Sequence, residues 1–96
     1  MSKAYLFLYD DAVGSREQLR GVLDSMLQVT NWRFDLPHCF YVVSPYSAED
    51  LYNAFVKKNG TKGRFMFIEA SANRQGLMLP DTWYLLTHKT HKPKNA

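Results

Sequence analysis

The sequence predicts a ferredoxin-like α+β fold, a two-layer sandwich in which two helices cover one face of an antiparallel four-stranded sheet. Two segments have the 3.6-residue apolar spacing of helices, and each lies between segments rich in aromatic and β-branched residues. The resulting order, β-α-β-β-α-β, is the split β-α-β arrangement. Because crossover connections are right-handed, both helices fall on one face, and the first and third strands become the central pair.

The first strand and helix are predicted within residues 3–28. Residues 3–9 have the length and aromatic content of a strand, and residues 11–14 form a turn. Ser15 and Gln18 have the spacing of a capping box. A helix over 16–28 is indicated by one apolar stripe, which consists of Leu19, Val22, Leu23, Met26 and Leu27.

The second half repeats the pattern. Alternating residues predict a strand over 32–36, Pro37 marks an edge or bend, and the "CFYVV" of residues 39–43 is a strand apolar on both faces. Ser47 caps a second helix that Gly60 ends, and residues 64–69 form the fourth strand. A short C-terminal element is either a helix that begins at Pro80 or a fifth strand over 83–87.

The length of 96 residues predicts one ferredoxin-like domain over 1–88 and a basic tail over 89–96. The net charge of +3 arises largely in that tail, which holds Lys89, Lys92 and Lys94 without an acid. This charge permits contact with nucleic acid but does not argue for it.

Cys39 is the single cysteine, so no intrachain disulfide forms, and no signal peptide is evident. Both features predict a reducing, cytoplasmic location. No apolar run approaches the roughly 18 residues that a membrane span requires, so no membrane contact is expected.

The two central strands are apolar on both faces, although helices are expected on one face only. A sheet face open to water normally alternates with polar residues. The open face is therefore covered by the Trp83 segment, by a second copy of the chain, or by both; a homodimer would bury roughly 800 Å² per chain. Stacking of RNA bases on the same aromatics is the less favoured reading, since only Lys3 accompanies them.

Several stretches together resemble the SinR-like small proteins of bacteria. These are "KAYLFLYD", "WRFDLPHCFYVVS", "SAEDL" and a late Pro-x-x-Trp at residues 80–83, and the resemblance extends over residues 3–87. SinR-like proteins are grouped by fold with the small endonuclease subunit of CRISPR adaptation and with VapD-type ribonuclease toxins.

The resemblance implies a role for Asp10, which closes the first strand after Tyr9. In the CRISPR-associated relatives the matching aspartate meets its copy across a dimer two-fold and is proposed to hold a divalent metal. By that match Asp10 is the catalytic and metal-binding candidate, with Mg²⁺ or Mn²⁺ as the ion and nucleic acid as the substrate.

The residues themselves leave a simpler interpretation open. Consecutive strand residues face opposite sides, so Asp10 and Asp11 do not chelate one ion together unless the strand ends between them. One aspartate would then bond the turn while the other is solvated. For the same reason His38 and Cys39 diverge and do not form a nucleophile pair. His88 and His91 lack a third ligand.

Four basic residues are the candidates for nucleic-acid contact. Lys62, Arg64 and Arg74 are expected to form a small basic rim near the fourth strand, and Arg33 lies next to Trp32. Two functions therefore remain open: a homodimeric, metal-dependent endonuclease or nucleic-acid-binding protein, and a non-catalytic dimeric protein-interaction module. Degradation of RNA or DNA with Mg²⁺ or Mn²⁺, abolished by Asp10→Ala, distinguishes them.

Overall fold

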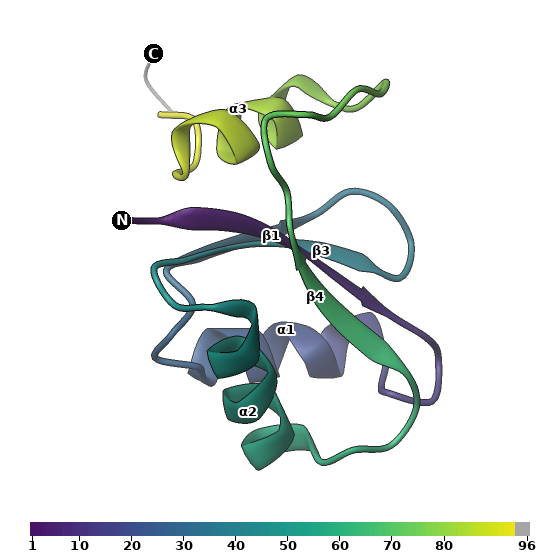
Figure 1. The fold of residues 1–96 in the computed structure, drawn as a ribbon. Helices are drawn as coiled ribbons and strands as arrows, with labels where there is room; N and C mark the ends of the chain where they lie inside the picture. Colours follow the sequence, from purple (N-terminus) through teal and green to yellow (C-terminus); the bar gives the residue numbers. More distant parts are fainter. Residues whose placement is uncertain (94–96) are drawn as a thin grey trace.

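A computed structural model describes residues 1–93, which form a four-stranded sheet with helices on both faces (Figure 1). The helices α1 and α2 lie on one side of the sheet and α3 lies on the other. In chain order the elements are β1 (Lys3–Tyr9), α1 (Arg16–Ser25), β2 (Asn31–Phe34), β3 (Cys39–Ser44), α2 (Ala48–Asn59), β4 (Phe65–Glu69) and α3 (Pro80–His88). The predicted α+β class is confirmed, and Lys94 of the predicted tail lies outside the described residues.

The strand order is β2-β3-β1-β4, and every neighbouring pair is antiparallel. The strands that α1 connects are therefore separated by β3, and those that α2 connects are separated by β1. As predicted, β1 and β3 are the central pair, with Phe7 opposite Phe40 in their register. On its other side β1 pairs Leu8 with Met66 and Leu6 with Ile68 of β4.

Side-chain caps begin the two helices that cover the first face. Ser15 and Gln18 form the predicted capping box of α1, and Ser47 and Asp50 form another at α2. Gly60 ends α2 with a positive φ of 80°, a conformation that favours glycine. The predicted extension of α1 to residue 28 is wrong, because the helix ends at Ser25 and leaves Leu27 94% exposed.

The larger core lies between the sheet and these two helices. Aromatic rings dominate it, and Phe7 is at the centre: its ring stacks on Phe67 at 4.6 Å and contacts Phe55 at 4.9 Å between centroids. Leu19 and Leu23 supply the apolar stripe of α1, while Leu51 and Phe55 supply that of α2.

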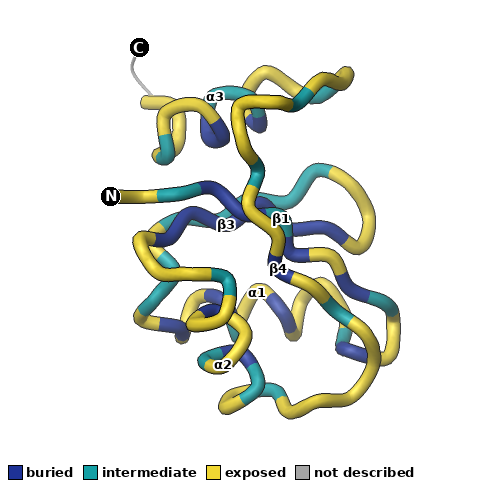
Figure 2. Tube along the Cα trace, viewed as in Figure 1, coloured by how far each residue is buried: buried dark blue, intermediate teal, exposed yellow. Residues whose placement is uncertain are grey.

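The opposite face of the sheet carries a second core beneath α3. Leu85 and Leu86 of α3 pack on alternate residues of the central strands, which are Ala4, Cys39, Tyr41 and Val43. This packing explains why all six residues of β3 are buried (Figure 2). Of the two predicted forms of the C-terminal element, the helix beginning at Pro80 is the one observed.

Candidate functional site

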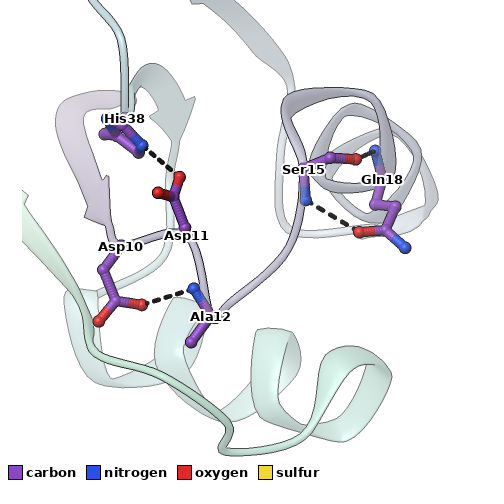
Figure 3. Close-up of polar contacts among 6 residues, drawn as sticks. All are labelled: Asp10, Asp11, Ala12, Ser15, Gln18 and His38. Carbon is purple, nitrogen blue, oxygen red and sulfur yellow. Dashed lines mark hydrogen bonds and ion pairs between the residues drawn. The ribbon is translucent and has the colours of Figure 1, made fainter.

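Asp10 directly follows β1 and organises the turn that leads toward α1 (Figure 3). Its Oδ1 accepts a hydrogen bond of 3.1 Å from the Ala12 backbone N–H, and its carbonyl accepts one of 3.1 Å from the Val13 N–H. A short side-chain acceptor that bonds the backbone two residues onward is typical of aspartate in turns. One oxygen of Asp10 therefore has a structural partner.

The second oxygen of Asp10 faces Arg64, which precedes β4. Arg64 Nε lies 3.7 Å from Asp10 Oδ2, and the Arg64 carbonyl accepts a hydrogen bond from the Asp10 N–H. The Arg64 side chain is 95% exposed, so the charge pair is screened by water and holds the carboxylate weakly. A competing ligand could displace this guanidinium at little cost.

A shallow hollow of about 330 Å³ opens beside the Asp10 carboxylate. Besides Asp10 and Arg64, its lining includes Leu8 and Met66, two exposed apolar side chains that pair across β1 and β4. Asp10 thus lies at the boundary between a polar turn and an apolar part of the sheet.

Asp11 points toward a different partner from Asp10, as expected for consecutive residues. Asp11 Oδ1 lies 2.6 Å from His38 Nε2, and both side chains are well exposed (Figure 3). His38 has a left-handed φ of 62° in the β2–β3 connection, so the bend predicted at Pro37 is confirmed. Two exposed partners make a contact that links two loops rather than an enclosed catalytic pair.

A metal site would require further ligands near these side chains. Within the described part of the chain, no group of three or more His, Cys, Asp and Glu side chains is placed to hold a metal ion. Asp10 therefore contributes one carboxylate per chain, which fits the predicted arrangement only if a second copy supplies another.

The predicted basic rim is spread over the two ends of β4. Arg64 precedes the strand and Arg74 follows it, so they lie beyond opposite ends of a five-residue strand roughly 17 Å long. Lys62 is exposed in the α2–β4 connection, on the Arg64 side. The structure thus brings Lys62 and Arg64 to the Asp10 end and leaves Arg74 near α3.

Arg33 is engaged within the fold. Its Nε donates to Thr82 Oγ1 at 2.8 Å, and its Nη1 lies 4.0 Å from Asp81 Oδ2. The Arg33 side chain is only 21% exposed. Its guanidinium is therefore occupied by contacts with α3 and offers little surface to a phosphate.

The sequence analysis missed a groove on the α3 side of the sheet. Its volume is about 460 Å³, and Cys39 and Tyr41 of β3 line it together with Trp83 of α3 and Arg74. Burial raises the pKa of the Cys39 thiol to about 11, although contact with Tyr41 opposes the shift. Burial also raises the pKa of the Tyr41 hydroxyl. The only sequence signal was the alternation of these two residues on a strand that is apolar on both faces.

None of the helices within residues 1–93 has the length and apolar character needed to cross a membrane. Comparison with known proteins found no matching family, curated relative or solved structure. The fold and the sites therefore define the chain only as a small α+β protein with an antiparallel sheet between two helical layers.

Proposed function

We propose that this chain is a homodimeric protein-interaction module with a ferredoxin-like fold. The proposal takes the uncovered part of the open sheet face as the dimer surface. The fold assignment is supported by the sheet order, which from the β4 edge runs β4-β1-β3-β2, and by the split β-α-β connections through α1 and α2. The SinR-like relationship and a cytoplasmic location remain predictions that accompany it.

One observation carries the proposal: α3 covers β3 but leaves apolar side chains of β1 and β4 open. Leu8 is 39% exposed, Met66 is 55% exposed and Ile68 is 47% exposed. These side chains are neighbours, because Leu8 pairs with Met66 and Leu6 with Ile68. Leu36, which is 49% exposed, lines the same groove as Leu8 and Ile68.

This apolar strip, defined as Leu8, Met66 and Ile68, continues along the free edge of the sheet. β4 pairs only with β1, so its outer backbone groups are also available to a partner. A standard interface of roughly 800 Å² per chain would occupy about one eighth of the 6190 Å² surface. Grouped apolar residues beside an open strand edge are typical of an association surface.

Light scattering of the purified chain tests the proposal. Wild-type protein is expected to have twice the 11.2 kDa chain mass at micromolar concentration, and Met66→Asp is expected to reduce it to one chain. Leu27→Asp is the matched control, since Leu27 is an exposed apolar residue in the α1–β2 connection. A monomeric wild-type protein would refute the dimer.

A metal-dependent nuclease is the second candidate, favoured by the position of Asp10 beside Leu8 and Met66 in one hollow. A two-fold through the apolar strip would bring the two copies of Asp10 toward each other. The exposed Arg64 side chain would yield its place to a divalent ion. A homodimer is therefore compatible with both the interaction module and the nuclease. An assay of nucleic-acid cleavage distinguishes the two.

Asp10→Asn separates catalysis from folding more sharply than Asp10→Ala. The amide oxygen can still accept from the Ala12 N–H, so the turn is retained while the metal-binding charge is lost. The nuclease function predicts cleavage of RNA or DNA with Mg²⁺ or Mn²⁺ by wild-type protein and none by Asp10→Asn. If the dimer is inert over both metals and both substrates, the interaction module stands alone.

A further inference from the structure

The groove beside α3 has the size and lining of a small-molecule site. Leu6, Cys39 and Tyr41 contribute from the central strands, while Trp83 and Leu86 contribute from α3. Its volume of about 460 Å³ lies within the range of ligand-binding cavities, which are mostly apolar with a few polar groups. The polar groups that line this groove therefore indicate what it would bind.

The Tyr41 hydroxyl is a buried polar group without a partner. The residue is 3% exposed, and its hydroxyl has no partner at hydrogen-bond geometry among residues 1–93; the neighbouring Cys39 thiol, a weak hydrogen-bonding group, is its nearest polar contact. Burying a hydroxyl without a partner is unfavourable, and native proteins rarely leave such a group unexplained. By contrast, the buried Tyr5 hydroxyl on the other face donates to the Tyr46 carbonyl at 2.6 Å. A ligand that offers an acceptor atom would supply the missing partner.

Arg74 brings a positive charge to the same groove. Its Nη1 donates to the Ser71 carbonyl at 2.9 Å, its Nη2 donates to Thr87 Oγ1 at 3.3 Å, and its guanidinium lies 5.8 Å from the Trp83 ring centroid. All these partners are neutral. Arg74 forms no ion pair with an acidic side chain among residues 1–93, so its charge is available to an anion.

Glu69 also borders the groove, but its charge acts mainly on the other face of the sheet. Along β4 it alternates in phase with Phe65 and Phe67, which belong to the larger core. Its carboxylate contributes to the raised pKa of Tyr5, which lies in that core. Glu69 therefore does not neutralise the guanidinium of Arg74.

We propose that this groove binds a small aromatic or aliphatic carboxylate. The apolar body of the ligand would lie against Leu6 and Trp83, its carboxylate would pair with Arg74, and an acceptor oxygen would meet the Tyr41 hydroxyl. Tyr41 lines the groove but its hydroxyl has no exposed surface, so side chains of the lining move when a ligand reaches it. All these residues come from a single chain, so the site does not require the proposed dimer, although Leu8 and Ile68 belong to both the groove and the dimer surface.

Trp83 supplies a direct readout of binding. The chain has two tryptophans, and Trp32 lies in the other core, where its Nε1 donates to Asp24. Trp32→Phe therefore leaves Trp83 as the single fluorescent indole. In this background 3-phenylpropanoate is expected to shift the Trp83 emission saturably, and to bind about tenfold tighter than its neutral amide.

Two variants test the groups that make the site, and two others are controls. Arg74→Gln should remove the preference for the acid over the amide, and Arg64→Gln should leave it unchanged because Arg64 lies outside the groove. Tyr41→Phe should weaken both probes by a similar factor. Met66 does not line the groove, whereas Leu8 and Ile68 of the dimer surface do. Met66→Asp, which frees that surface, should therefore leave the preference for the acid unchanged and should weaken neither probe.

Two results would overturn the proposal. The first is the absence of a saturable Trp83 response to the acid in folded protein, or an undiminished preference for the acid in Arg74→Gln. The second is an acid that acts only by dissociating a dimer, which would make the second copy the occupant of the groove. A monomeric protein that still binds the acid would refute the dimer and leave the carboxylate site intact.

Discussion

Arg33 on the edge strand β2 donates from Nε to the hydroxyl of Thr82 on α3, at 2.8 Å. The same Thr82 hydroxyl donates to Asp35 Oδ2 at 2.6 Å, so it joins a cation to an anion. Thr82 is fully buried. This chain of three residues fixes α3 against the sheet at its β2 edge, while the apolar contacts of Leu85 and Leu86 fix it over the centre.

Removal of the Thr82 hydroxyl should therefore loosen α3. Thr82→Val keeps the volume but leaves Arg33 and Asp35 without their shared partner, and we expect it to lower the free energy of unfolding by about 1–3 kcal/mol. Urea denaturation measures the loss. Thr61→Val, at an exposed position, is the control. Equal stability of the two variants would show that the chain of hydrogen bonds is not stabilising.

Two buried tyrosines on opposite faces of the sheet, Tyr41 and Tyr5, should respond oppositely to the same substitution. Tyr41→Phe removes a hydroxyl without a partner and should raise the free energy of unfolding by about 1 kcal/mol. Tyr5→Phe removes the donor to the Tyr46 carbonyl and should lower it by about 1 kcal/mol. Chemical denaturation in the absence of ligands measures both changes. A loss of stability in Tyr41→Phe would mean that its hydroxyl has a partner.

Two glycines give a similarly matched pair for backbone conformation. Gly63 has a φ of +74°, and a Cβ there would lie 2.6 Å from Asp10 Oδ1 and 2.7 Å from the Val13 nitrogen. Gly63→Ala should therefore lower the free energy of unfolding by at least about 1 kcal/mol. Gly21→Ala lies within α1 with open space around it, and should raise it by roughly 0.5–1 kcal/mol. Thermal unfolding resolves the two directions.

The stability of the fold should decrease in alkaline solution. The pKa of Cys39 is raised to about 11 from an ordinary value of 9.0, so between these values the unfolded chain releases a proton that the folded chain retains. Stability therefore falls as pH rises from 9 to 11, by up to about 1.4 kcal/mol per pH unit for this group.

Denaturation curves at pH 8, 9, 10 and 11 test this slope. Cys39→Ala should make it shallower, while the raised pKa values of Tyr41 and Tyr5 supply the remainder. Within the folded state at neutral pH, the buried thiol should also react slowly with thiol reagents. An unchanged slope in Cys39→Ala would contradict the assignment.

The sequence predicted the elements well because their signals are local. Ser15 with Gln18 and Ser47 with the acids after it mark helix starts within single turns, and the structure has both capping boxes. The α1 end was harder to predict: Met26 and Leu27 continue the apolar spacing, but the C-cap residue Met26 already has an extended backbone. Spacing alone does not reveal where a backbone leaves the helix.

The candidate sites were less predictable because they depend on contacts between distant residues. The sequence indicated that one of Asp10 and Asp11 could bond the turn, but not which of the two does so. The engagement of Arg33 by Thr82 joins residues 49 positions apart, and Arg74 reaches the groove only through the path of residues 70–79. No local pattern in the sequence encodes such partners.

The placement of α3 has a consequence for how the chain acquires its structure during translation. The larger core is complete once β4 has been made, whereas the second core joins Ala4, near the amino terminus, to Leu85 and Leu86. A nascent chain on the ribosome can therefore form the larger core early. The apolar face of β1 and β3 that packs against α3 stays exposed until α3 emerges. In that interval the exposed strands are a natural target for chaperones.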